Sequence, residues 1–199
     1  QAGTAQVLVD LQHGLRFESE QGAGPHTRVT RSEVRLDTAA GELSGTVHSR
    51  NWVEREASFV LRFSQPVARA ETLPPRPGER APRYLLSFDL KGARQLQARV
   101  ALSTVDVDGA RRNLGEAEGR SFEQVRAAAD AAWEARLSRI RIEAPVAQQR
   151  VFYTALYHAL LHPSDIADVD GRVRGPTGEV INAPGGRYDS TLSLWDTFR

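Results

Sequence analysis

The sequence predicts a mainly β protein with α-helices in its second half, and an antiparallel sandwich is expected to come first. Two observations predict the sandwich: short runs of alternating apolar residues in the first hundred positions, and glycine or proline turns between these runs. Such runs are typical of half-buried strands paired in an antiparallel sheet. A third observation predicts the helices, because the apolar period changes near residue 106 to that of an α-helix.

The clearest strand pattern lies in the middle of the sandwich. Phe59, Leu61 and Phe63 occupy every second position, which predicts a strand with one face toward a core. The segment 73–82 carries four prolines and one glycine, which predicts an exposed loop. Further strands are expected near 7–12, 29–36, 43–47, 85–90 and 96–105.

A capping box predicts the first long helix. The hydroxyl of Ser121 can accept a hydrogen bond from the backbone N–H of Gln124, whose side chain can reach back to Ser121. Apolar residues follow at helical spacing up to Leu137, so a helix is predicted over 121–138.

Shorter elements surround this helix. We expect a short helix over 110–118, a short strand over 139–143 and a second long helix over 148–161, which ends before Pro163. Trp133 and Phe152 lie on apolar stripes of the two long helices, and we expect both to pack against the sandwich.

Composition excludes several classes of protein. The 26 basic and 25 acidic residues leave a formal net charge of +1, which gives no general attraction to nucleic acid or to anionic lipid. The chain contains no cysteine, so disulfides, thiolate metal sites and cysteine nucleophiles are excluded. No apolar run approaches the roughly 20 residues of a transmembrane helix. The chain begins with Gln1 rather than methionine, so we expect an excerpt or a processed protein.

Two groups of polar side chains have the residue types of a metal or acid–base site. His158 and His162 are four positions apart, but they lack the glutamate of an HExxH zinc motif, so packing or a hydrogen bond is favoured. Asp165, Asp168 and Asp170 could bind calcium or act as acid and base. Their spacing fails the pattern of a calcium loop, so capping and turn formation are favoured. The glycine-containing segment 171–186 matches no phosphate loop and is expected to be a hairpin or a connecting loop.

The end of the chain pairs an aromatic ring with a carboxylate. Trp195 and Asp196 combine an apolar face with a charged acceptor, which suits a sugar that presents C–H faces and hydroxyl groups. By itself this pair is also compatible with ordinary packing.

Longer motifs give a resemblance to a known family. The segment 152–163 reads FYTALYHALLHP, the segment 168–172 reads DVDGR, and the segment 193–199 reads SLWDTFR. Together they resemble glycoside hydrolase family 92, whose members include exo-acting α-mannosidases. The segments 100–103 and 110–114 also resemble this family. Val173 and Phe198 depart from its usual aromatic residue and tyrosine.

The resemblance implies a fold and a division of the chain. It implies an antiparallel β-supersandwich joined by linker helices to an (α/α)6 barrel that this chain does not include. We therefore expect a sandwich portion at 1–105, a helical linker at 106–163, and a loop-rich segment at 164–199 that enters the catalytic barrel. The chain would be an internal fragment of a larger protein.

The resemblance also implies an activity. The expected function is that of the non-catalytic N-terminal part of a calcium-dependent, inverting exo-α-mannosidase, which hydrolyses terminal α-mannosides of glycans. The catalytic acid and base and the calcium ligands would lie outside this chain, so we assign no catalytic or metal residue here. Trp195 and Asp196 are the candidate substrate-binding residues, because they lie in a matching motif.

Partners and location are expected on the same basis. The partners would be mannose-containing glycans and the catalytic barrel of the same polypeptide, with no nucleic acid and no membrane. The family implies a periplasmic or secreted protein. Two alternatives stay open: another glycosidase or phosphorylase that joins a supersandwich to an (α/α)6 barrel, and a free-standing carbohydrate-binding module.

Overall fold

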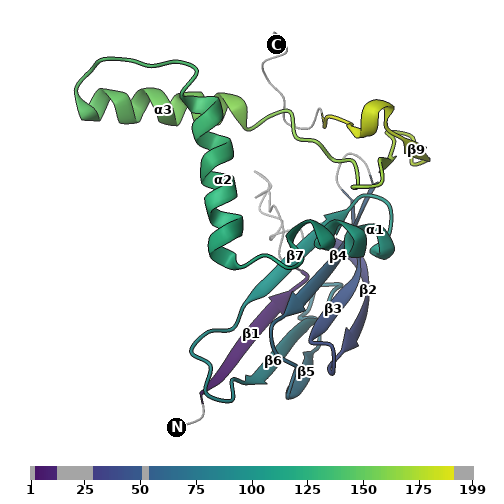
Figure 1. Ribbon diagram of the computed structural model, residues 1–199. Helices are drawn as coiled ribbons and strands as arrows, with labels where there is room; N and C mark the ends of the chain where they lie inside the picture. The colour runs from purple at the N-terminus through teal and green to yellow at the C-terminus, as the bar shows by residue number, and fades with distance from the viewer. Residues whose placement is uncertain (1–2, 13–28, 51–53, 191–199) are drawn as a thin grey trace.

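The first hundred residues fold into two antiparallel sheets, as the alternating runs predict. A computed structural model describes residues 3–12, 29–50 and 54–190, and Figure 1 shows the arrangement of the elements. A three-stranded sheet has the order β1 (Thr4–Asp10), β6 (Arg83–Asp89), β5 (Arg69–Leu73). A four-stranded sheet has the order β2 (Val29–Asp37), β3 (Glu42–Arg50), β4 (Glu54–Phe63), β7 (Ala98–Ser103). All these pairs are antiparallel, so the predicted fold class is confirmed.

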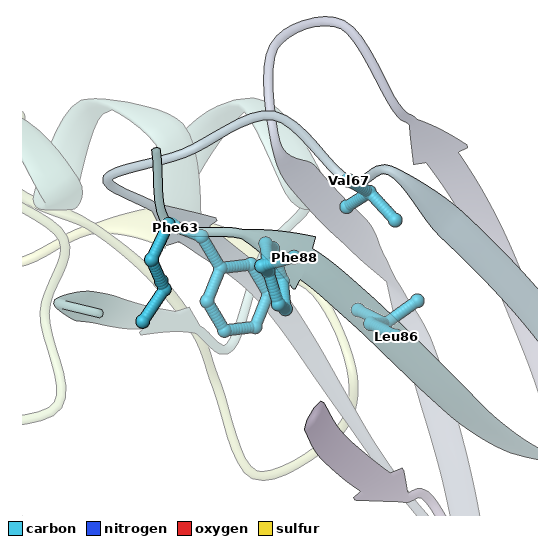
Figure 2. Packing of buried hydrophobic residues seen from close by; sticks show 5 residues of the cluster. Phe63, Val67, Leu86 and Phe88 are labelled. Carbon is cyan, nitrogen blue, oxygen red and sulfur yellow. The ribbon is translucent and has the colours of Figure 1, made fainter. Parts of the chain in front are cut away.

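A core of apolar side chains joins the two sheets. Phe63 from β4 meets Phe88 from β6 with ring centroids 4.6 Å apart, and Leu86 is fully buried beside them. Figure 2 shows these side chains together with Val67. Full burial of one such side chain contributes roughly 1.5–3 kcal/mol, so this cluster is a main source of the sandwich's stability.

A short helix covers the other face of the four-stranded sheet. Helix α1 (Val107–Leu114) buries Ala110 and Leu114 against Val60 of β4. Asp106 caps the helix by accepting a hydrogen bond of 2.6 Å from the backbone N–H of Gly109. A 3-10 turn, η1 (Gly115–Ala117), continues it. The predicted short helix is confirmed, with its start three residues earlier than expected.

The two long helices are confirmed within two residues of their predicted ends. In α2 (Phe122–Leu137) the capping box is complete, because Gln124 N–H donates to Ser121 Oγ at 3.2 Å and Ser121 N–H donates to Gln124 Oε1 at 2.8 Å. Helix α3 (Val146–Leu160) crosses the end of α2 in Figure 1. The structure describes every residue of both helices, and none of these residues is buried.

Two expectations about this region are wrong. Residues 139–143 form no strand, because no described strand lies beside them to supply hydrogen-bond partners; instead the Ile140 carbonyl accepts a bond from the Tyr153 hydroxyl at 3.1 Å. The aromatic partner of Trp133 is Tyr157 of α3, with ring centroids 4.6 Å apart, and Phe152 contacts Tyr153 at 5.2 Å. These rings pack within and between the helices rather than against the sandwich.

The glycine-containing segment forms a hairpin, as predicted. Strand β8 (Arg172–Arg174) pairs with β9 (Val180–Asn182), and a 3-10 turn, η2 (Pro184–Gly186), follows. Val173 at the centre of β8 is fully buried. This hairpin lies close to α1 in Figure 1.

Candidate functional site

The candidate sugar-binding residues Trp195 and Asp196 lie outside the described residues. Ser190 is the last described residue, and Trp195 follows five positions later. The functional region open to description is therefore the segment 164–190, which leads into the motif, together with the elements that hold it.

The two ends of this segment are held together by backbone hydrogen bonds. Ser190 N–H donates to the Ser164 carbonyl at 2.7 Å, and Ile166 N–H donates to the Tyr188 carbonyl at 2.9 Å. Ser190 is itself buried. The position of residue 190 therefore depends on the position of residues 164–166.

Asp165 strengthens this closure. Its Oδ1 accepts hydrogen bonds from the backbone N–H groups of Tyr188, at 3.0 Å, and Ala167, at 3.1 Å. The bond from Tyr188 lowers the pKa of Asp165, partial burial acts in the opposite direction, and the bond from Ala167 lowers it further. Asp170 similarly accepts a bond from the Arg172 N–H at 3.2 Å. The turn-forming roles predicted for Asp165 and Asp170 are confirmed.

Asp168 has a different role, which the sequence interpretation missed. Its side chain is only 2% exposed and joins the segment to two distant elements. The Ser103 hydroxyl, at the end of β7, donates to Asp168 Oδ2 at 2.7 Å. The Asn113 amide, in α1, donates to Asp168 Oδ1 at 2.8 Å. We call these three residues the Asp168 cluster.

The donors in the Asp168 cluster are fixed in direction by their other hydrogen bonds. Ser103 Oγ already accepts from the backbone N–H of Val105 at 2.9 Å and of Asp106 at 3.3 Å, so its hydrogen is left to point at Asp168. Asn113 donates to the Leu102 carbonyl at 2.7 Å and accepts from the Val169 N–H at 2.9 Å, which sets its amide orientation. Asp168 is therefore an acceptor at both oxygens.

Close approach between the segment and α1 requires a glycine. A Cβ placed on Gly109 would lie 2.2 Å from Asp168 Oδ2 and 2.6 Å from Ser103 Oγ. Any other residue at position 109 would push the carboxyl group out of the Asp168 cluster. The close packing of this segment therefore depends on Gly109 of α1 as well as on residues of the segment.

Ion pairs surround the Asp168 cluster. Arg172 donates to Asp106 at 3.2 Å and to Asp170 at 3.0 Å, and Arg112 of α1 also contacts Asp170 at 2.9 Å. Burial alone would raise the pKa of Asp106, but the hydrogen bonds from the Gly109 N–H and from Arg172 outweigh it and hold the pKa below its ordinary value.

Arg174 attaches β8 to the residues that follow β7. Its guanidinium donates to the Thr104 carbonyl and to the Val105 carbonyl, both at 2.9 Å. The segment 164–190 is thus fastened to the sandwich and α1 at several points by long-range contacts, one buried and the others mostly part-buried.

A polar hollow of about 360 Å³ lies beside the Asp168 cluster, between β7 and the segment 164–190. Asn113, Asp165 and Asp168 are among its lining residues. Both side-chain polar atoms of Asn113 and of Asp168, and Oδ1 of Asp165, are already engaged by the contacts described above. Within the described part of the chain, no group of three or more His, Cys, Asp or Glu side chains is placed to hold a metal ion. The arrangement is therefore suited to holding the segment in place.

The two histidines of the possible zinc pair lie at the end of α3. His158 is in the last turn of that helix, where its ring lies 5.7 Å from the ring of Tyr157, and His162 follows the helix. His158 is exposed, and this ring contact is with its neighbour in sequence, so it is no buried packing of the kind favoured for His158.

Known proteins resemble this chain in sequence and in fold. The profile of the glycosyl hydrolase family 92 catalytic domain matches residues 109–199. The fold matches a family GH92 α-mannosidase from Bacteroides thetaiotaomicron with a TM-score of 0.76 and 29% identity over 86% of this chain. The resemblance to family 92 is confirmed. A search of curated proteins gave no match.

Two further structures have the same fold. A GH92 family glycosyl hydrolase matches 96% of this chain with a TM-score of 0.79 and 27% identity. An inverting GH92 mannosidase from Bacteroides thetaiotaomicron matches 86% with a TM-score of 0.73 and 22% identity, which supports the fold alone. The chain spans about a quarter of the length of each: 25%, 26% and 25% of the three structures.

Proposed function

We propose that this chain is the non-catalytic N-terminal part of an exo-α-mannosidase that removes terminal α-mannosides from glycans. The observation that carries the proposal is the match to an α-mannosidase at 29% identity over 86% of the chain. The motifs in 152–199, which fall inside the matched family profile, support the same assignment.

The proposed enzyme divides its work between regions. We propose a sandwich portion at 1–105, a linker at 106–163 and a segment at 164–199 that enters an (α/α)6 barrel. The barrel would supply the acid, the base and the calcium ligands. An inverting glycosidase needs its two carboxyl groups roughly 6.5–9.5 Å apart, so that a water molecule fits between the base and the sugar.

In this division, the described residues hold the first part of the segment that would enter the barrel. The hydrogen bonds at Ser164, Asp165 and Asp168 fix the backbone up to Ser190. Trp195 and Asp196 would then meet the terminal mannose: the indole covers an apolar face of the sugar, and the carboxylate accepts hydrogen bonds from its hydroxyls.

Partners and location follow from the proposed activity. The substrates would be mannose-containing glycans, and one solved GH92 α-mannosidase with the same fold is in complex with mannoimidazole. The near-zero net charge favours neither nucleic acid nor anionic membranes as partners. No helix in the described part of the chain is long and apolar enough to cross a membrane. We propose a periplasmic or secreted location.

The first experiment compares the 199-residue chain with the full-length enzyme. Both are purified and assayed with an aryl α-mannoside, with and without a calcium chelator. The full-length enzyme should release the aryl group, lose activity on chelation and regain it with added calcium, whereas the isolated chain should give no turnover. Turnover by the isolated chain at the full-length rate would refute its non-catalytic role. A full-length protein inactive on α-mannosides, yet active on another glycoside, would refute the substrate assignment.

The second experiment tests Asp196. Asp196→Asn in the full-length enzyme keeps the size of the side chain and removes its charge. We expect kcat/KM to fall at least about tenfold, which corresponds to about 1.4 kcal/mol of lost transition-state stabilisation, with an unchanged melting temperature. Normal kinetics with a lowered melting temperature would instead assign Asp196 to a helix cap.

A further inference from the structure

The Asp168 cluster lies far from any proposed sugar contact in sequence, but it controls the segment that leads to those contacts. Asp168 connects to Ser103 at the end of β7 and to Asn113 in α1, which are 65 and 55 positions away. These two hydrogen bonds are 2.7 and 2.8 Å long, and a third, from the Val169 N–H to Asn113 Oδ1, is 2.9 Å long. This contact joins residues 164–170 to the sandwich and α1, while Arg172 and Arg174 hold the hairpin that follows.

This position is transmitted to the last described residue by short steps. Asp168 is two residues after Ile166, whose N–H donates to the Tyr188 carbonyl, and three residues after Asp165, which receives the Tyr188 N–H. Ser190 in turn donates to the Ser164 carbonyl. A shift of Asp168 would therefore move residues 164–166, and these would move residues 188–190.

We infer that Asp168, held by Ser103 and Asn113, is a positioning residue for sugar binding by the Trp195–Asp196 motif; this inference rests on the proposed function. Asp168 is buried and both of its oxygens are occupied. It therefore acts on the sugar only through the backbone that leads from Ser190 into the motif.

The chemistry of the Asp168 cluster makes the role specific to a carboxylate. Ser103 and Asn113 both present a hydrogen to Asp168, and their other bonds prevent either from turning round. An asparagine at position 168 has one acceptor oxygen and one N–H2 group. One of the two donors would then face another donor in a buried place, and the segment would shift to relieve that contact.

A neighbouring pair of serines offers a matched control. Ser58 of β4 pairs directly with Ser103 of β7 in the four-stranded sheet, and both are almost fully buried, with 3% and 5% exposure. The Ser58 hydroxyl, however, bonds to Thr46 within the sheet at 2.8 Å. Ser58→Ala and Ser103→Ala each remove one buried hydroxyl from the same place, but only Ser103→Ala loosens Asp168.

The test uses the full-length enzyme with the substitutions Asp168→Asn, Ser103→Ala and Ser58→Ala. KM and kcat for an aryl α-mannoside and the melting temperature are measured for each. We expect KM to rise about tenfold in Asp168→Asn and about threefold in Ser103→Ala, with kcat changed less than about twofold, as for a loss of uniform binding. Ser58→Ala should keep the KM of the wild type, even where its melting temperature falls as much as that of Ser103→Ala.

Each other outcome has a definite meaning. Unchanged KM in Asp168→Asn and Ser103→Ala, with lowered melting temperatures, overturns the inference but leaves the proposed function standing. An equal rise of KM in Ser58→Ala also overturns it, because general loosening would then explain the effect. Where Asp168→Asn does not fold, the comparison of Ser103→Ala with Ser58→Ala decides alone. A wild-type enzyme that does not hydrolyse α-mannosides overturns both proposals.

Discussion

The sandwich and the pair of helices α2 and α3 are built on different principles. The two sheets bury large side chains such as Leu86 and Phe88 between them, at 0% and 1% exposure. The helices bury none of their residues and leave Phe122 and Val151 at 63% and 71% exposure. The sheets depend on contacts distant in sequence, whereas these helices are defined by local signals such as the capping box.

This difference explains why one substitution should be severe in one region and mild in the other. A buried side chain loses transfer free energy and leaves a cavity when it is truncated. A half-exposed side chain on a helix loses only the contacts on one side. The comparison predicts an order of effects, from the core of the sandwich to the cap of α2.

The largest effect is expected in the core between the sheets. Phe88→Ala should lower the free energy of unfolding by about 3–5 kcal/mol, because it removes the ring that packs against Phe63. Urea denaturation of the chain followed by circular dichroism measures the change. Leu85→Ala is the control, since Leu85 lies in the same strand with its side chain on the opposite face, and it should cost less than half as much. Equal losses of unfolding free energy in the two variants would contradict the assignment of the core to the face of β6 that carries Phe88.

A smaller, pH-dependent effect is expected where α1 joins the four-stranded sheet. Glu42 of β3 receives Arg62 at 2.8 Å and Arg111 of α1 at 3.0 Å. Burial alone would raise its pKa, but the hydrogen bonds and charges of the two arginines lower it. Glu42→Gln should therefore lower the free energy of unfolding by about 2 kcal/mol at neutral pH.

The pH dependence of this contribution follows from the lowered pKa. The folded protein binds its proton at Glu42 less readily than the unfolded chain does, so the contribution is complete above the unfolded pKa, near 4.5. It is lost as the pH falls through the folded pKa. Urea denaturation at a series of pH values should show the two proteins converging in acid. Glu54→Gln, in an exposed pair with Arg50 at 3.8 Å, is the control and should differ little from the wild type at any pH. A constant difference down to the lowest pH would contradict the assignment to Glu42.

The helices should respond more weakly, even at their largest aromatic residue. Trp133→Ala should lower the free energy of unfolding by about 1 kcal/mol, because the ring is half-exposed and mainly contacts Tyr157. A double-mutant cycle with Tyr157→Ala measures the coupling, expected at about 0.5–1.5 kcal/mol. A loss as large as that of Phe88→Ala would restore the expectation that Trp133 packs in a core.

The same contrast separates what the sequence predicted from what it did not. Alternation at Phe59, Leu61 and Phe63 and the capping box at Ser121 are local patterns, and both elements formed as predicted. The strand predicted over 139–143 did not form. A strand also needs a hydrogen-bonded partner, and the sequence does not show whether one lies nearby.

The candidate site shows this limit more sharply. The turn roles of Asp165 and Asp170 depend on residues two positions away, and they could be predicted. The role of Asp168 depends on Ser103 and Asn113, so it became visible only with the fold. Both donors lie in segments that resemble family 92, but the resemblance gave them no role. The need for glycine at position 109 also became apparent only when the structure placed Asp168 beside it.

The smallest effect on the protein as a whole is expected at the start of α2, where the loss should be confined to the first turn of the helix. Ser121→Ala removes the side-chain acceptor for the Gln124 N–H and should destabilise the first turn by about 1 kcal/mol. Since no residue of α2 is buried, the rest of the protein should hardly respond.

Hydrogen exchange followed by mass spectrometry separates the two responses. In Ser121→Ala the amides of the first turns of α2 should exchange about fivefold faster, which corresponds to about 1 kcal/mol, while those of β4 and β6 keep their protection. Ser138→Ala at the other end is the control, because Ser138 caps the helix through its backbone N–H, which donates to the Glu134 carbonyl at 2.9 Å. Alanine keeps that group, so exchange in α2 should stay at the wild-type rate. If Ser121→Ala instead speeds exchange in β4 and β6 to the same extent, α2 unfolds together with the sandwich, and the two regions form one cooperative unit despite their different burial.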